Sequence, residues 1–340
     1  MPEVKKIQLF TATSNLGSLL QLISLVAAYT GKGNHLKNVT MIKEIFVVIS
    51  LFLISTVLFS QDRTIDSLLL TRKTDSLDGS VKTYYSPGNK KIATELQQLV
   101  SDAILYYENK YKIKFNLQII VLDSGQWFKE ISPYGFVFYD GTHWLVLNTG
   151  MNYKNFKSVY GFNSISHEFD SSFKKNKITA EEVIYSRLKF LSLHELGHYF
   201  IDNLSNAQSP NVWANEFIAW YFANEYMTKY HPEIKKGFDV FCHTVSSFYP
   251  VEHTALDDFN ELYAKIKIGN FAWYHSRFYF LADTLYKCAG ESYLQTFETN
   301  FPKKEALNFS QVMINKLIEA NCSNVVSNWT NITEANLKNQ

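Results

Sequence analysis

The sequence predicts an α+β fold, in which a helix and a few strands come first and a run of helices follows. Three observations carry this prediction: apolar residues at helical spacing after residue 90, two aromatic and β-branched runs around an Asp-Gly pair, and a helical pattern from residue 211 onward. Because the strands and the later helices are separated along the chain and do not alternate, we expect an antiparallel or mixed sheet. The 340 residues are enough for one large domain or two small ones.

A helix and a strand are the first expected elements. Asn89 is suited to begin the helix as its cap. The strand is expected in "NLQIIVLD", residues 116–123, a short apolar run of the length that strands favour. Apolar side chains recur along one face of the expected helix, at Ile92, Leu96, Leu99, Ala103 and Ile104.

A hairpin is expected next, in "YGFVFYDGTHWLVLNTG", because two runs typical of strands flank Asp140-Gly141. The following helix opens at Thr179, which forms a capping box with Glu182 three residues later, and it should run through His198. Beyond it, "WANEFIAWYFANEYMTKY" is the clearest of the later helical segments.

Composition excludes several classes of protein. Hydrophobic residues make up 46% of the chain and aromatic residues 16%, so a disordered chain is excluded. The net charge is +1 and no strong basic block is present, which argues against a nucleic-acid partner. The three cysteines include no CxxC pair, so a thiolate zinc site is not expected. One disulfide among Cys242, Cys288 and Cys322 would suit an oxidising compartment, with its pairing left open.

Residues 41–60 have the layout of a secretory signal peptide. Lys43 gives a positive start, an apolar stretch runs from Ile45 to Phe59, and cleavage is expected after Ser60. The chain is therefore predicted to be exported, as a periplasmic or secreted protein. The alternative is that Ile45 to Phe59 is retained as a membrane anchor, although it is short for a full span.

The signal peptide divides the rest of the chain. Residues 1–40 precede it and are interpreted as an over-extended N-terminus. Residues 61–83 are polar and are interpreted as a linker. The main domain is expected over residues 84–330, followed by a tail at 331–340.

The segment "LSLHELGHYF" carries the strongest functional motif. Residues four apart on a helix lie on one face, so His194 and His198 can converge on one metal ion. Glu195 is placed to reach a metal-bound water as a general base without binding the metal. A hydrolytic zinc site of this kind needs three protein ligands and one open position.

Glu216 is the expected third ligand. It lies in the apolar run "NVWANEFIAWYFA", where an unpaired carboxylate would be costly to bury, and Ala219 and Ala223 would let two helices approach closely. Asp202 is an alternative, as a ligand or as a group that orients a histidine. A metzincin-like layout is excluded, because Ile201 and Leu204 occupy the positions of its glycine and third histidine.

"HELGH" followed by "VWANEFIAWYFA" resembles the gluzincin group of zinc metallopeptidases, the broad peptidase MA-like families, whose W-x-x-E helix is matched by Trp213 to Glu216. The resemblance covers roughly residues 90 to 300, and only the zinc motif in it is specific. It implies a zincin-like fold with an edge hairpin before the active-site helix, one Zn²⁺ ion and peptide-bond hydrolysis. One departure is Trp220, where thermolysin-type chains carry an aspartate four residues after the glutamate ligand.

The resemblance also implies a tyrosine or histidine near the metal, within "AWYHSRFYFLADTLYKCAG". We expect Tyr274 first and His275 second to stabilise the oxyanion. If "THWLVLN" is an exposed edge strand, it would pair with an extended peptide substrate; otherwise it is an ordinary core hairpin. Two alternatives to an enzyme remain: an exported protein with a purely structural zinc, and a membrane-tethered binding protein.

Overall fold

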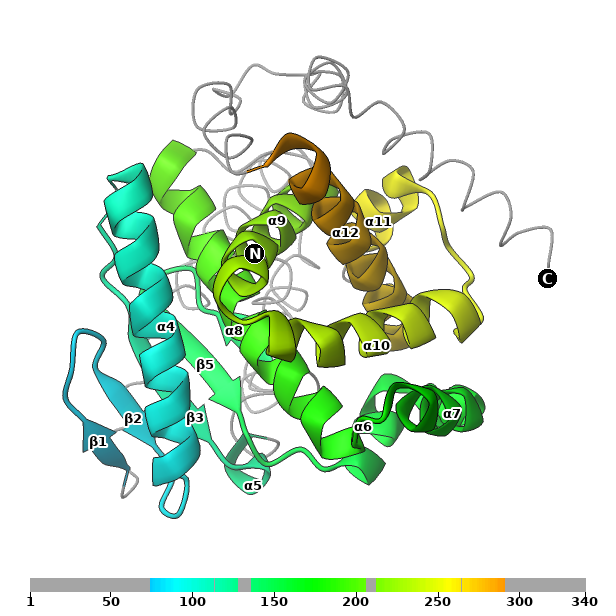
Figure 1. Ribbon diagram of the computed structural model, residues 1–340, viewed down its shortest axis with the longest axis horizontal. Helices are drawn as coiled ribbons and strands as arrows, with labels where there is room; N and C mark the ends of the chain where they lie inside the picture. Colours follow the sequence, from blue (N-terminus) through cyan, green and yellow to red (C-terminus); the bar gives the residue numbers. More distant parts are fainter. Residues whose placement is uncertain (1–73, 113, 128–135, 206–211, 264, 291–340) are drawn as a thin grey trace, which may run out of the picture. The chain divides into compact units, whose positions relative to one another are not determined.

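A five-stranded sheet and a group of long helices make up the part of the chain that the computed structural model describes, residues 74–112, 114–127, 136–205, 212–263 and 265–290 (Figure 1). The predicted α+β class is confirmed. The predicted signal peptide, the segment before it and the C-terminal tail lie outside the described residues. Among the described residues, no helix combines the length and the apolar character needed to cross a membrane.

The sheet is mixed, with the order β1-β2-β3-β5-β4. Its two outer pairs, β1–β2 and β4–β5, are antiparallel, while β2–β3 and β3–β5 are parallel. The expected hairpin is therefore present at one edge of the sheet. The strands are β1 (Asp75–Leu77), β2 (Thr83–Tyr85), β3 (Gln118–Leu122), β4 (Val137–Tyr139) and β5 (Trp144–Asn148).

The predicted linker over residues 61–83 is corrected in its second half. Strand β1 and the first residue of β2 fall inside it, and both strands belong to the sheet. Gln97 of the first long helix ties this segment down, donating from Nε2 to the Val81 carbonyl at 2.8 Å. Strands of three residues are too short to show the alternation that identifies a strand in sequence.

Helices α4 (Lys90–Tyr111) and α8 (Ala180–Ser205) pack against the sheet and against each other (Figure 1). The apolar face predicted for α4 is largely buried, but Asn89 makes no side-chain capping bond. The capping box of α8 is confirmed, since the Thr179 and Glu182 side chains each bond the other residue's backbone N–H. The remaining helices are α5 (Ser124–Gln126), α6 (Tyr153–Tyr160), the 3-10 helix η2 (Phe162–Ile165), α7 (Ser166–Asn176), α9 (Val212–Tyr230), α10 (Pro232–Phe248), α11 (Leu256–Leu262) and α12 (Ile268–Ala289).

The side chain of Asp140 holds the turn of the hairpin that the Asp140-Gly141 pair predicted. Its Oδ1 accepts the backbone N–H groups of Thr142, His143 and Trp144 at 2.9–3.0 Å. Gly141 takes a φ of +82°, in the left-handed region that glycine adopts without strain. This turn fixes where β4 ends relative to β5.

Helices α8 and α9 touch backbone to backbone beside the HELGH motif. A Cβ added at Gly197 would lie 2.8 Å from the Ala219 Cα, a distance that real Cβ atoms essentially never show. The expected small residue Ala219 therefore does bring the two helices together, and Gly197 is its counterpart on α8. Any larger residue at 197 would push the helices apart.

The described cysteines differ in state. Cys288 is disulfide-bonded, whereas Cys242 of α10 is free and fully buried. Burial raises the pKa of the Cys242 thiol well above its ordinary value. Of the pairings left open by the sequence, those that use Cys242 are therefore not formed.

Candidate functional site

Three potential ligand atoms converge between α8 and α9. Glu216 Oε2 lies 3.0 Å from His194 Nε2 and 3.3 Å from His198 Nε2, and the two histidine nitrogens are 3.2 Å apart. His194 and Glu216 are almost completely buried, while His198 is partly exposed. The described residues include two groups that could hold a metal ion: His194 with Glu195 and His198, and His194 with Glu216 and His275. Between them these groups contain the three ligands that the sequence predicted, His194, His198 and Glu216.

Glu195 lies beside this cluster and faces the edge of the sheet. It forms a possible metal-holding group with His194 and His198. Its Oε2 accepts the backbone N–H of Tyr139, the last residue of β4, at 3.0 Å. The edge strand therefore fixes the orientation of the carboxylate predicted to act as a base.

The charges in the cluster suit the binding of a cation. Burial opposes ionisation of Glu216, but the charge of His198 and the hydrogen bonds from His194 and His198 outweigh it and hold the carboxyl pKa well below its usual range. Burial lowers the pKa of His194 to about 4, so its imidazole is neutral. Burial also lowers the pKa of His198, but the negative charges of Glu216 and, less strongly, Glu195 outweigh this effect and raise the pKa to about 9. A cation binding here would displace the proton from His198.

His275 of α12 reaches the same cluster. Its Nε2 lies 3.8 Å from Glu216 Oε2. Trp220 donates its indole N–H to His275 Nδ1 at 3.2 Å. Because an indole is only a donor, Nδ1 must accept, and the proton of the neutral ring sits on Nε2. Burial lowers the pKa of His275 to about 3, which keeps the ring neutral. His275 therefore presents an N–H to the cluster and is better suited to donate a hydrogen bond than to bind a metal.

Trp220, one turn beyond Glu216 on α9, supports the cluster through its ring and its N–H. Its ring packs against His194, with ring centroids 4.1 Å apart, while its N–H holds His275. Phe238 and Tyr279 pack against the same indole. One aromatic side chain thus orients two of the histidines.

Tyr274, expected before His275 as the oxyanion donor, points elsewhere. Its hydroxyl donates to the Ala255 carbonyl at 2.7 Å, and no contact among the described residues joins it to Glu216 or the histidines. The tyrosine that contacts the cluster is Tyr263, at the end of α11, whose hydroxyl donates to Glu216 Oε1 at 2.6 Å. Sequence reasoning missed Tyr263, which lies 47 residues beyond Glu216 with no motif to mark it.

The segment "THWLVLN" is not the exposed edge strand that the first of our two interpretations required. Residues 142–148 contain β5, which is paired on both sides, by β3 and β4. The edge strand is β4, and its bonds to β5 at Phe136 and Asp140 turn the main-chain groups of Val137 and Tyr139 outward. Asp202, the alternative ligand, belongs to neither possible metal-holding group of the described residues, and its charge contributes to the raised pKa of His198.

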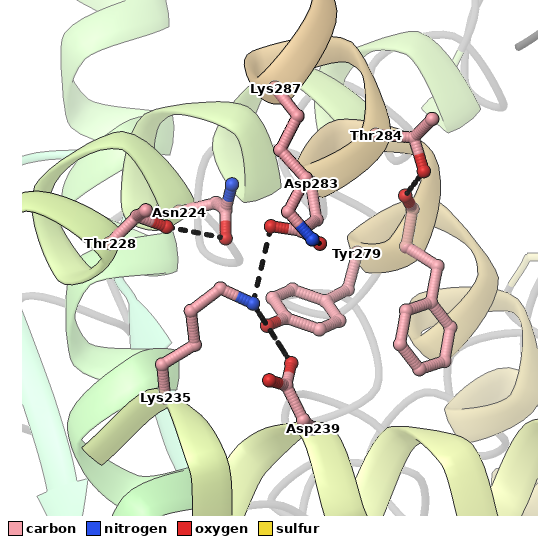
Figure 2. Close-up of polar contacts among 9 residues, drawn as sticks. Asn224, Thr228, Lys235, Asp239, Tyr279, Asp283, Thr284 and Lys287 are labelled. Carbon is pink, nitrogen blue, oxygen red and sulfur yellow. Dashed lines mark hydrogen bonds and ion pairs between the residues drawn. The ribbon is translucent and has the colours of Figure 1, made fainter. Parts of the chain in front are cut away.

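A buried polar network anchors the helix that carries His275. Figure 2 shows Lys235 of α10 reaching Asp239 of its own helix and Tyr279 and Asp283 of α12. Lys235 Nζ lies 2.9 Å from Asp239 Oδ1 and 3.2 Å from Asp283 Oδ1, and it also bonds the Tyr279 hydroxyl. Tyr279 is one turn beyond His275 and packs against Trp220. The network therefore fixes α12 beside the cluster.

Replacing Tyr263 by Phe should weaken metal binding by about 10–100-fold, because it removes the hydrogen bond that orients the Glu216 carboxylate. Competition with a fluorescent chelator measures this affinity. Tyr274→Phe is the matched control, since it removes a hydroxyl bonded to Ala255 and should leave the affinity unchanged. Equal affinities for the two variants would show that Tyr263 does not support the cluster.

Comparison with models of known protein families, with curated proteins and with solved structures finds no match to this chain.

Proposed function

We propose that this chain is a zinc-dependent peptidase with a zincin-like fold of the gluzincin type. The observation that supports it best is the spacing of the three ligand atoms of His194, His198 and Glu216, 3.0–3.3 Å from one another. Ligands of a tetrahedral zinc, bound at about 2.0–2.2 Å, stand roughly 3.3–3.6 Å apart. The cluster is thus within a few tenths of an ångström of a tetrahedral face.

The chemistry of the donors fits zinc as well as the spacing does. Two imidazoles and one carboxylate form a known ligand set of catalytic zinc sites, with the fourth position left to water or substrate. Bound there, zinc would polarise the scissile carbonyl and lower the pKa of its water. His194, His198 and Glu216 would be its ligands, and Tyr263 would hold the carboxylate.

Glu195 is the proposed general base. It takes the proton of the attacking water and passes it to the leaving amine. Tyr139 of the edge strand keeps its carboxylate in place. The neutral His275 donates from Nε2 to the oxygen on which negative charge develops, because its other nitrogen accepts from Trp220.

The proposed substrate is a peptide or an unfolded segment. A chain in extended form can pair with the main-chain groups of Val137 and with the Tyr139 carbonyl, because only the Tyr139 N–H is taken by Glu195, and this pairing brings the chain beside Glu195. We further propose that the protein is exported, on the strength of the signal-like sequence at residues 41–60.

Metal analysis of the purified protein, combined with a quenched-fluorescence peptide library, tests the proposal. We expect about one zinc per chain, and peptide cleavage that a chelator abolishes and added zinc restores. Bound zinc without cleavage of any peptide would leave a structural metal site and contradict the proposed activity. Cleavage that persists after complete removal of the metal would contradict the mechanism.

A further inference from the structure

Arg187 of α8 is a buried cation that the proposed mechanism does not use. The residue is 7% exposed and its guanidinium is surrounded by aromatic rings. Its Nη2 donates to the Tyr160 hydroxyl at 2.9 Å, while Nε and Nη1 have no hydrogen-bond partner. No carboxylate of the described residues forms an ion pair with it. Its Cζ lies 4.6–5.7 Å from the ring centroids of Phe136, Phe156, Tyr160 and Phe241.

In this environment the guanidinium lacks a counter-charge among the described residues and acceptors for two of its nitrogens. Arginine stays charged inside proteins, and a buried charge is normally paired with an opposite one. The aromatic faces stabilise the positive charge, but they do not replace acceptors for the Nε and Nη1 hydrogens. An anion with oxygen acceptors, such as a carboxylate, would satisfy both the charge and these donors.

The position of Arg187 relates it to the zinc-binding cluster. It precedes His194 by seven residues, so it lies on the same face of α8, about 10 Å along the helix axis. Burial is the main cause of the low pKa values of His194 and His275, and the positive charge of Arg187 lowers both pKa values further. Phe136, which packs on Arg187, directly precedes β4, whose Tyr139 holds Glu195. Glu195 and Arg187 therefore lie along the same helix, and each contacts one end of the segment from Phe136 to Tyr139.

The direction of β4 indicates which end of a peptide would approach Arg187. The chain runs from Phe136, which lies beside Arg187 and directly precedes β4, to Tyr139 at the end of β4, beside Glu195. A peptide paired antiparallel to β4, the slightly more stable arrangement, runs the opposite way. The part that follows the cleaved bond then extends toward Arg187, and about three extended residues span the distance.

We propose that Arg187 binds a carboxylate of the peptide substrate on the leaving-amine side of the cleaved bond. The inference rests on the proposed peptidase function. The carboxylate is either the C-terminus of the peptide or an acidic side chain up to about three residues beyond the cleaved bond.

Peptides that differ only in this group test the proposal. One pair carries a free or an amidated C-terminus three residues after the cleaved bond, and the other carries Glu or Gln at that position within a longer peptide. For at least one pair, kcat/KM of the wild type should be at least tenfold higher for the carboxylate form. Arg187→Met should reduce this preference to less than twofold, and Arg187→Lys should retain part of it. Arg277→Met on α12 is the matched control and should keep the full preference.

A binding measurement separates failure of this inference from failure of the proposed function. Zinc-loaded Glu195→Gln protein should bind the preferred carboxylate peptide at least tenfold more tightly than its neutral partner, measured by fluorescence anisotropy. If no peptide is cleaved but this difference is present and Arg187→Met removes it, the proposed activity fails and the binding site stands. If the wild type cleaves both members of each pair equally, the inference is overturned while the peptidase stands. That result needs no variant, so a misfolded Arg187→Met cannot obscure it.

Discussion

Replacing Glu195 by Gln should leave zinc bound and reduce peptide cleavage by about 10²–10⁴-fold, the contribution typical of a positioned general base. The side chain keeps its size, and its amide oxygen can still accept the Tyr139 N–H that orients Glu195. What it loses is the ability to take a proton from water. The measurements are the zinc content of the purified variant and its kcat/KM on the best peptide of the library.

Glu181→Gln is the control for this experiment. Glu181 lies on the same helix, in its exposed first turn, and the same chemical change there should leave both zinc content and activity unchanged. A Glu195→Gln variant that keeps more than a tenth of the activity would show that another group takes the proton. Loss of zinc in that variant would instead place Glu195 among the ligands.

Replacing Lys235 by Ala should lower the free energy of unfolding by about 3 kcal/mol, because it leaves a buried carboxylate without its buried partner. The Asp283 and Lys235 side chains are 9% and 10% exposed, and their charged atoms lie 3.2 Å apart. We expect the low end of the usual range, since Asp283 keeps its second partner Lys287 and since Asp239, at 42% exposure, is partly solvated. Urea denaturation followed by circular dichroism measures the change.

Lys287→Ala provides the matched comparison, because Lys287 pairs with the same Asp283 but its side chain is 67% exposed. A surface pair of this kind contributes about 0–1 kcal/mol. If both lysine variants lose equal stability, the network in Figure 2 does not anchor α12 in the way described. A loss of peptidase activity beyond the loss of folded protein would show that the network also positions His275.

The parts of the site that lie on one regular element could be predicted from the sequence. The spacing of His194 and His198 has a fixed meaning on a helix, and the capping box at Thr179 identified that helix. Glu216 was identifiable because a carboxylate in an apolar helix needs a partner. The hairpin was identifiable because Asp-Gly between two strand-like runs has few other structures.

The rest of the site depends on how separate elements pack, which spacing along the chain does not reveal. Tyr263 and Tyr274 are equally plausible as sequence, and only the packing of α11 and α12 decides which hydroxyl reaches Glu216. Nothing in the sequence sets Arg187 apart; its four surrounding rings, and the two donors that have no partner among the described residues, become evident only in the structure. The identity of the edge strand likewise depends on the β3–β5 pairing, which is a long-range contact.

The close approach at Gly197 and Ala219 has a consequence for how an ion would be captured. Main-chain atoms, rather than long flexible side chains, set the separation of the two helices that carry the three proposed ligands. The entropy of arranging these ligands is therefore already lost when the protein folds, and little of the coordination energy is spent on ordering them afterwards. The proposed metal site is therefore rigid before an ion binds. A cation that needs longer metal–ligand distances could bind only if the two helices moved apart, which would strain the backbone.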